Sequence, residues 1–248
     1  MDFQTFGENK GLGIVLLPGL FAAGWIWEDV KKELVDYGYA GAILNSAFAE
    51  ITPKGDALAY LQAEIEKTVQ KLDFDRYIVC GNSLGGLLAL KIHALKNINS
   101  IGAIVSGSPG FGKTSDLGLS AKRFFSLTDA EYVSSLLFSN KDCVTKEQMG
   151  ASLKYFSKRK SLLNIAKYMK NTNDVNIDHI LENLNDNVML IWGANDNITS
   201  TEGVKKKMSI NNHLYLEMIS NCGHSPMLEK PKDFSFLMDQ YIKKTIQS

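Results

Sequence analysis

The sequence contains few cysteines, no excess of either charge and no long apolar run. Its 248 residues include three cysteines, Cys80, Cys143 and Cys222, an odd number without C-x-x-C or metal-type spacing. We interpret them as reduced thiols in a cytoplasmic protein. Lys plus Arg and Asp plus Glu both number 27, so the net charge is zero and nothing favours binding to nucleic acid or to an anionic membrane surface.

Segments that would insert into a membrane or bind a metal are also missing from the sequence. No apolar run approaches the roughly 20 residues that a membrane span needs, and residues 1–10 are polar and mixed, unlike a targeting segment. No cluster of His, Cys and carboxylate residues has ligand spacing, so we expect no metal and no other cofactor. The remaining composition, 45% hydrophobic and 22% charged, is typical of a soluble globular protein with one large α/β domain.

Short apolar runs alternate with helical patterns along most of the chain. Runs typical of buried strands lie at 13–17, 39–44, 77–80, 101–106, 188–192 and 213–219. Helical patterns lie near 25–34, at 56–72, from 84 onward and at 233–246. This alternation predicts an α/β fold with a mostly parallel central sheet and helices on both faces.

The pattern changes between residues 111 and 185, where no β-like run occurs. Helical stretches are expected around 121–125, 129–138, 146–156 and 161–169. We therefore predict a core formed by residues 1–110 and 186–248, with residues 111–185 inserted as a helical cap over the strand ends. Aromatic residues of this insertion, among them Tyr155 and Tyr168, suit either an acyl pocket or ordinary packing within the cap.

The pentapeptide Gly-Asn-Ser-Leu-Gly at residues 81–85 carries the strongest functional signal. It is a G-x-S-x-G motif with a strand before it and a helix after it. In that context a sharp turn exposes the hydroxyl of Ser83 and places the N–H of Leu84 at a helix N-terminus, where it can stabilise an oxyanion. The alternative is that Ser83 merely caps a helix.

A nucleophilic serine needs a histidine base and a carboxylate that orients the base, in the chain order Ser, Asp or Glu, His for this kind of turn. Asp196 and His224 fit, because each follows a predicted strand directly. Asp186 is a weaker candidate, since it precedes its strand. Three other histidines are rivals of His224 in less suitable positions: His93, His179 and His213.

Three segments in this order resemble the α/β-hydrolase fold superfamily, within it the small esterases and C–C-bond hydrolases with a helical cap. They are Gly-Asn-Ser-Leu-Gly-Gly from residue 81, Ile-Trp-Gly-Ala-Asn-Asp from 191 and Gly-His-Ser-Pro-Met-Leu-Glu-Lys-Pro from 223. The resemblance covers nearly the whole chain. It implies Ser83 as nucleophile, His224 as general base and then acid, and Asp196 as the orienting carboxylate.

The resemblance also implies that the oxyanion is bound by the backbone N–H groups of Leu84 and Leu20, with Phe21 as the fallback for Leu20. One departure concerns this loop, because Pro18-Gly19 stands where the family usually has His-Gly. A second is the short segment before the first buried strand, from which we expect the outermost strand to be abbreviated or missing.

Together these features predict a serine hydrolase that cleaves an ester of a small or medium acyl group, with a small-molecule substrate as its partner. Thioester hydrolysis, C–C bond cleavage, acyl transfer or cyclisation could use the same triad. A ligand-binding protein that kept the fold and lost turnover is a further alternative.

Overall fold

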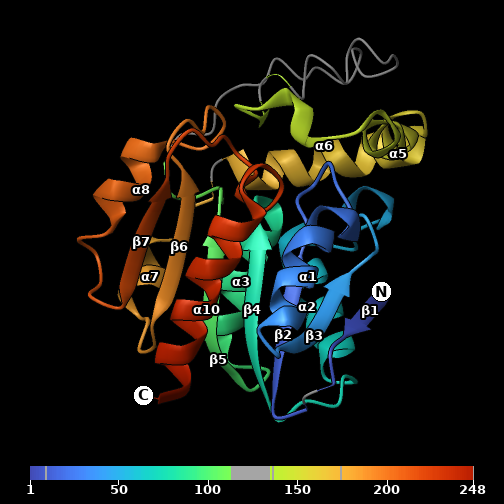
Figure 1. The fold of residues 1–248 in the computed structure, drawn as a ribbon. Helices are drawn as coiled ribbons and strands as arrows, with labels where there is room; N and C mark the ends of the chain where they lie inside the picture. Colours follow the sequence, from blue (N-terminus) through green and yellow to red (C-terminus); the bar gives the residue numbers. More distant parts are fainter. Residues whose placement is uncertain (9, 113–134, 136, 174, 248) are drawn as a thin grey trace.

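The computed structural model describes residues 1–8, 10–112, 135, 137–173 and 175–247. Its centre is a seven-stranded sheet in the order β1-β3-β2-β4-β5-β6-β7 (Figure 1). Only β1 is antiparallel to its neighbour; the other neighbouring strands run parallel. The strands are β1 Phe3–Phe6, β2 Leu12–Leu17, β3 Ala40–Leu44, β4 Arg76–Asn82, β5 Ser100–Ser106, β6 Val188–Gly193 and β7 Leu214–Ile219.

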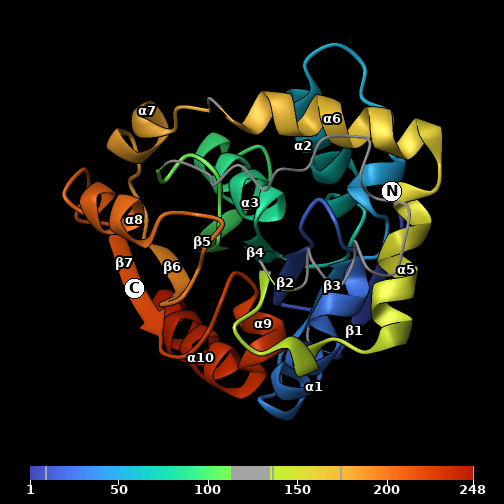
Figure 2. The same cartoon turned by 90° about the horizontal axis from the view of Figure 1, so that it is seen from above.

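Helices cover both faces of this sheet (Figure 2). The α-helices are α1 Glu28–Asp36, α2 Ala57–Val69, α3 Leu84–Leu95, α5 Lys146–Phe156, α6 Arg159–Asn173, α7 Asp178–Glu182, α8 Thr201–Lys207, α9 Pro226–Glu229 and α10 Pro231–Gln247. Three 3₁₀ turns complete the described elements: η1 Gly24–Trp27, η2 Phe48–Glu50 and η3 Lys141–Cys143.

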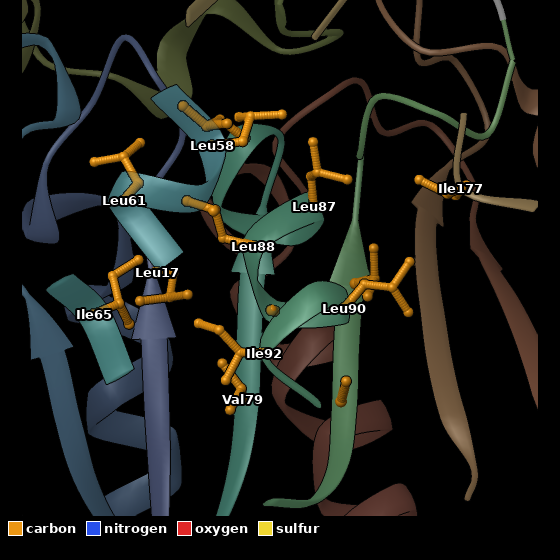
Figure 3. Packing of buried hydrophobic residues seen from close by; sticks show 14 of the residues in the cluster. Leu17, Leu58, Leu61, Ile65, Val79, Leu87, Leu88, Leu90, Ile92 and Ile177 are labelled. Carbon is orange, nitrogen blue, oxygen red and sulfur yellow. The ribbon is translucent and has the colours of Figure 1, made fainter. Parts of the chain in front are cut away.

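The central strands are apolar along their whole length because both of their faces are buried. Successive side chains of a strand point to opposite faces, so Val15 and Leu17 of β2 join the core under α2 and α3, while Ile14 and Leu16 join the core under α1 and α10. Figure 3 shows the first of these cores, where leucines of α2 and α3 pack on the sheet. The predicted mostly parallel sheet with helices on both faces is therefore confirmed.

The edge strand β1 is abbreviated, as the short segment before the first buried strand led us to expect. It is only four residues long, and its two central residues are exposed to solvent. A half-solvated edge strand needs no continuous apolar run, so its hydrophobic pattern is weak. The segment is a strand because it pairs antiparallel with β3, where Phe3 lies opposite Leu44.

The region between β5 and β6 is helical, as expected. Helices α5 and α6 contain the stretches predicted at 146–156 and 161–169, and α6 runs across the upper end of the sheet (Figure 1). Two buried side chains tie α6 to the loop after β3: Asn164 donates to the carbonyl of Ala49 at 2.9 Å, and the Tyr168 hydroxyl donates to the carbonyl of Ile51 at 2.8 Å. Tyr168 thus serves packing. The stretch expected at 121–125 and most of that at 129–138 lie outside the described residues.

Candidate active site

Ser83 lies in the tight turn between β4 and α3, at the carboxyl edge of the sheet. Its backbone angles, φ 55° and ψ −122°, are unusual for a residue with a side chain. The turn is crowded: a Cβ on Gly81 would lie 2.1 Å from the carbonyl oxygen of Gly85, and one on Gly85 would lie 2.4 Å from that of Pro18. The Ser83 N–H donates to the carbonyl of Ser106 on β5 at 2.8 Å. The glycines of the motif are therefore required by space, because a Cβ at either position would overlap neighbouring backbone.

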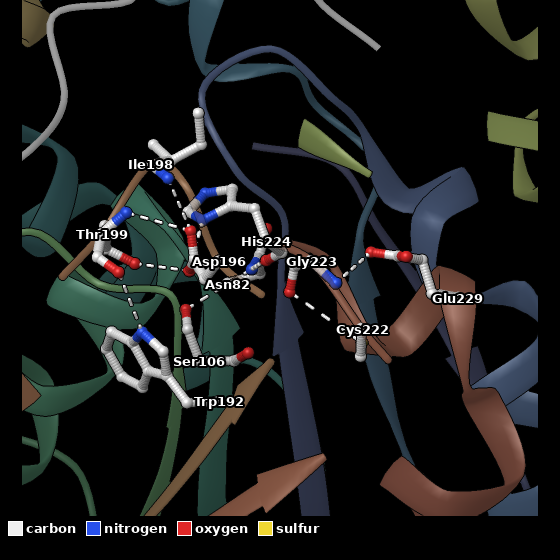
Figure 4. Close-up of polar contacts among 10 residues, drawn as sticks. All are labelled: Asn82, Ser106, Trp192, Asp196, Ile198, Thr199, Cys222, Gly223, His224 and Glu229. Carbon is white, nitrogen blue, oxygen red and sulfur yellow. Dashed lines mark hydrogen bonds and ion pairs between the residues drawn. The ribbon is translucent and has the colours of Figure 1, made fainter. Parts of the chain in front are cut away.

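His224 and Asp196 form a hydrogen-bonded pair in the loops after β7 and β6 (Figure 4). The Nδ1 atom of His224 lies 2.9 Å from Oδ2 of Asp196, and both residues are buried, with 4% and 8% of their surfaces exposed. Because a carboxylate can only accept, the hydrogen belongs to Nδ1, and this leaves Nε2 of the neutral ring as a proton acceptor. This is the tautomer that a general base needs.

The carboxylate of Asp196 is held by the turn that follows it. Its Oδ1 accepts the N–H groups of Ile198 at 2.8 Å and Thr199 at 3.0 Å, and its Oδ2 accepts the Thr199 hydroxyl at 2.6 Å. Burial opposes ionisation of this carboxyl, but the positive charge that His224 can carry and the hydrogen bonds from His224 and Thr199 outweigh burial and lower its pKa. Asp196 is therefore an ionised, fixed acceptor.

The His224 loop is fixed through its backbone. The His224 N–H donates to the carbonyl of Leu137 at 2.8 Å, and the His224 carbonyl accepts from the amide of Asn82 at 3.0 Å. Asn82 directly precedes Ser83, so the Ser83 turn and the His224 loop are bonded to each other. Gly107 lies against the imidazole, since a Cβ there would be 2.8 Å from Cε1 of His224.

The two expected oxyanion donors belong to the two turns that meet at Ser83, the one after β2 and the one before α3. Leu84 is the first residue of α3, so its N–H has no acceptor within the helix. Leu20 lies in the turn after β2 and is 5% exposed. A Cβ on the preceding Gly19 would be 3.3 Å from Cβ of Ser83, so this turn borders the serine side chain despite Pro18. Their role as donors stays a prediction.

The rival residues lie away from this edge. His213 and Asp186 precede β7 and β6, at the amino ends of these strands, where His213 contacts Asn187 and Asp186 pairs with Lys96. His179 is exposed on α7. His93 is buried in α3 and its Nδ1 lies 2.9 Å from Oγ of Ser100. Of the four histidines, the structure places His224 beside a buried carboxylate.

Sequence reasoning did not identify four residues that contact the Ser83 turn, Asp196 or the His224 loop: Asn82, Gly107, Thr199 and Glu229. Asn82 occupies a variable position of the motif, and Gly107 lies in the loop directly after β5. Thr199 and Glu229 follow their triad partners by three and five residues. Nothing local in the sequence shows which of these side chains point towards the triad.

None of the three cysteines has the lowered pKa of an activated thiol. All three are free, and burial raises the pKa of Cys80 and of Cys222 well above that of an ordinary thiol. Burial also raises the pKa of Cys143 to about 12. Among the described residues no group of three His, Cys, Asp or Glu side chains could hold a metal ion. The same residues contain no helix long and apolar enough to cross a membrane.

A serine in a tight strand-to-helix turn, followed along the chain by a buried aspartate–histidine pair, is typical of one class of hydrolases, and comparison with known sequences identifies the same class. A model of the Alpha/beta hydrolase family matches residues 14–235, which is most of the chain, so the chain belongs to this family. No curated protein sequence matches the chain.

Solved structures of several hydrolases share the fold. A membrane phospholipase A, described as a bacterial virulence factor, is 13% identical with a TM-score of 0.85, covering 99% of this chain and 83% of that one. An esterase from Exiguobacterium antarcticum is 18% identical with a TM-score of 0.76, covering 97% and 94%. A meta-cleavage product hydrolase, CumD, is 15% identical with a TM-score of 0.76, covering 98% and 94%. At such identities the likeness concerns the fold.

Proposed function

We propose that this α/β hydrolase cleaves esters of a small or medium acyl group through an acyl-enzyme on Ser83. The observation that carries the proposal is the buried hydrogen bond between His224 and Asp196, in a loop that Asn82 bonds to the strained Ser83 turn. A serine that only capped α3 would need neither the strained backbone of Ser83 nor a buried histidine bonded to an ionised carboxylate. Family membership and the fold shared with esterases support the reaction class.

In the proposed mechanism, Oγ of Ser83 attacks the acyl carbon while Nε2 of His224 takes its proton. Charge develops on the former carbonyl oxygen, which the N–H groups of Leu84 and Leu20 stabilise. His224 then protonates the leaving alcohol. A water molecule, activated by the same nitrogen, releases the acid and restores Ser83.

Asp196 stays ionised throughout this cycle. Its hydrogen bond keeps the proton of the neutral ring on Nδ1 and stabilises the imidazolium that forms at each proton transfer. The three hydrogen bonds from Ile198 and Thr199 keep the carboxylate in place while the histidine changes charge. The site therefore has a base, an orienting acid and a nucleophile in defined positions.

Thioesters, β-diketone-type C–C bonds and acyl transfer would use the same residues, and a pure binding protein would use none of them catalytically. A fluorophosphonate probe separates these cases, because it reacts only with an activated serine. The probe is applied to the wild type, to Ser83→Ala and to Ser209→Ala, whose exposed hydroxyl controls for unspecific labelling. Hydrolysis of p-nitrophenyl esters of increasing acyl length is measured alongside.

We expect labelling and ester hydrolysis by the wild type and by Ser209→Ala, and loss of both in Ser83→Ala, by about 10³-fold or more in kcat. The preferred chain length then measures the acyl pocket. Labelling without ester turnover would favour C–C cleavage or acyl transfer. A wild type that neither labels nor hydrolyses would refute the proposal and favour a binding protein.

A further inference from the structure

Glu229 makes three hydrogen bonds that the proposed mechanism does not require. It is the last residue of α9, five positions after His224, and 9% of its surface is exposed. Its Oε1 accepts the N–H of Gly223 at 2.8 Å, and its Oε2 accepts the N–H groups of Ser139 and Asn140 at 2.9 and 3.0 Å. One buried carboxylate thus bonds to two stretches of backbone that are far apart in the sequence.

These two stretches are the histidine loop and residues 137–140 of the insertion. They also touch directly, because the His224 N–H donates to the carbonyl of Leu137 at 2.8 Å. Their approach is close: a Cβ on Gly223 would lie 2.7 Å from that carbonyl oxygen and 2.9 Å from Oε1 of Glu229. The histidine loop therefore takes its position partly from the insertion, with the carboxylate as the bridge.

Asp196 and Glu229 lie on either side of the Gly223–His224 backbone (Figure 4). Asp196 orients the ring, and Asn82 bonds to the carbonyl of His224. Glu229 adds the contact that holds the residue before the histidine. Without the Glu229–Gly223 hydrogen bond, the loop gains freedom to rotate, and the imidazole of His224 moves away from Asp196. A displacement of a catalytic group by about 1 Å is enough to slow catalysis strongly.

We propose that Glu229 is a positioning residue, whose carboxylate locks residues 137–140 to the Gly223–His224 loop and so keeps His224 aligned for catalysis. This rests on the proposed function of His224 as the general base. The inference couples the insertion to the chemistry, because the buried carboxylate of Glu229 accepts hydrogen bonds both from residues 139 and 140 of the insertion and from Gly223, the residue before His224.

Glu229→Gln tests the proposal with little change of shape. The glutamine keeps one oxygen acceptor but puts an NH₂ donor in place of the other, so it cannot accept from both backbone stretches. Glu66→Gln is the matched control. Glu66 is also buried, at 8% exposure, and its two oxygens accept from the side chains of Gln62 at 2.8 Å and Asn97 at 2.9 Å. Asn97 follows the C-terminal end of α3, whereas Ser83 precedes its first residue, so this carboxylate lies at the other end of the helix.

We expect Glu229→Gln to lower kcat for a p-nitrophenyl ester by about 10- to 100-fold with KM nearly unchanged, because the base is misplaced while the acyl pocket is intact. Glu66→Gln should keep the kcat of the wild type. Glu229→Asp, which keeps the charge but shortens the side chain by one carbon, gives a second variant if the glutamine variant does not fold, and it should also lose kcat. Folded Glu229 variants with the kcat of the wild type would overturn the proposal.

A second readout needs no substrate. Nitrogen NMR of isotope-labelled histidine, above about pH 8 where an ordinary imidazole is neutral, reports which ring nitrogen carries the proton. We expect His224 to hold its proton on Nδ1 in the wild type and in Glu66→Gln, and to show both tautomers in Glu229→Gln. An unchanged tautomer in Glu229→Gln would contradict the positioning role. A wild type without esterase activity would refute the proposed function, whereas this measurement would still decide the role of Glu229.

Discussion

Two buried histidines, His224 and His93, lie at opposite ends of the strands and differ in their neighbours. His224 is 4% exposed and its Nδ1 bonds to the carboxylate of Asp196. His93 is 1% exposed; its Nδ1 contacts Ser100, and its Nε2 has no hydrogen-bond partner among the described residues. Burial alone therefore does not distinguish the histidine proposed as catalytic from a structural one.

The two histidines also differ in the charged groups beside them. Burial and then the ammonium group of Lys96 lower the pKa of His93 to about 4, against the weaker opposite influence of Asp186. His93 therefore stays neutral at neutral pH and can neither store nor pass on a proton there. Beside His224, by contrast, the ionised carboxylate of Asp196 can stabilise an imidazolium.

The largest expected effect comes from replacing each histidine by glutamine. His224→Gln removes the base, so kcat/KM for a p-nitrophenyl ester should fall by about 10⁴-fold. His93→Gln should stay within a few-fold of the wild type once the folded fraction is corrected for. Steady-state kinetics on both variants measures this. Equal losses of kcat/KM in the two variants would show that His224 has no catalytic role that His93 lacks.

Replacing the carboxylates tests the cause of the difference. In Asp196→Asn the amide oxygen can still accept from Ile198 and Thr199, but the NH₂ group faces Nδ1 of His224 and favours the wrong tautomer. We expect a loss of kcat of about 10³- to 10⁴-fold with the fold retained. The control is Asp186→Asn near His93, which should leave kcat unchanged; activity in Asp196→Asn close to that of the wild type would remove Asp196 from the triad.

The smallest effect concerns stability rather than activity. Since the pKa of His93 is lower in the folded chain, about 4 against 6.5, the unfolded chain binds the extra proton between these values. The contribution of neutral His93 to the unfolding free energy is therefore complete above pH 6.5 and is lost as the pH falls towards 4. From about pH 7 to pH 5 it should cost about 2 kcal/mol of unfolding free energy.

His93→Gln isolates this contribution, because glutamine does not titrate. Urea unfolding of the wild type and the variant at both pH values measures it, and the stability difference between pH 7 and pH 5 should shrink by about that amount in the variant. An unchanged difference would show that His93 is not the group that senses acid.

Local periodicity was sufficient to predict the main sheet and most helices. Strands β2, β4 and β6 are short apolar runs because they are buried on both faces, and α2 carries one apolar stripe. The serine turn was equally local, since G-x-S-x-G between strand and helix restricts the backbone within five residues. The chain order then selected Asp196 and His224, because both follow strands whose carboxyl ends meet at one edge.

The contacts that complete the site depend on the tertiary structure. Asn82 and His224 are separated by 142 positions, and Glu229 and Ser139 by 90, so no periodic pattern links them. The outermost strand was expected to be abbreviated or missing, but the residues that form β1 were not identified, because they make a strand through their pairing with β3. The sequence determined the sheet, the Ser83 turn and the chain order of the proposed triad because these follow from local backbone and burial preferences. Which loops meet around His224, and through which side chains, was decided only by the packing of the whole chain.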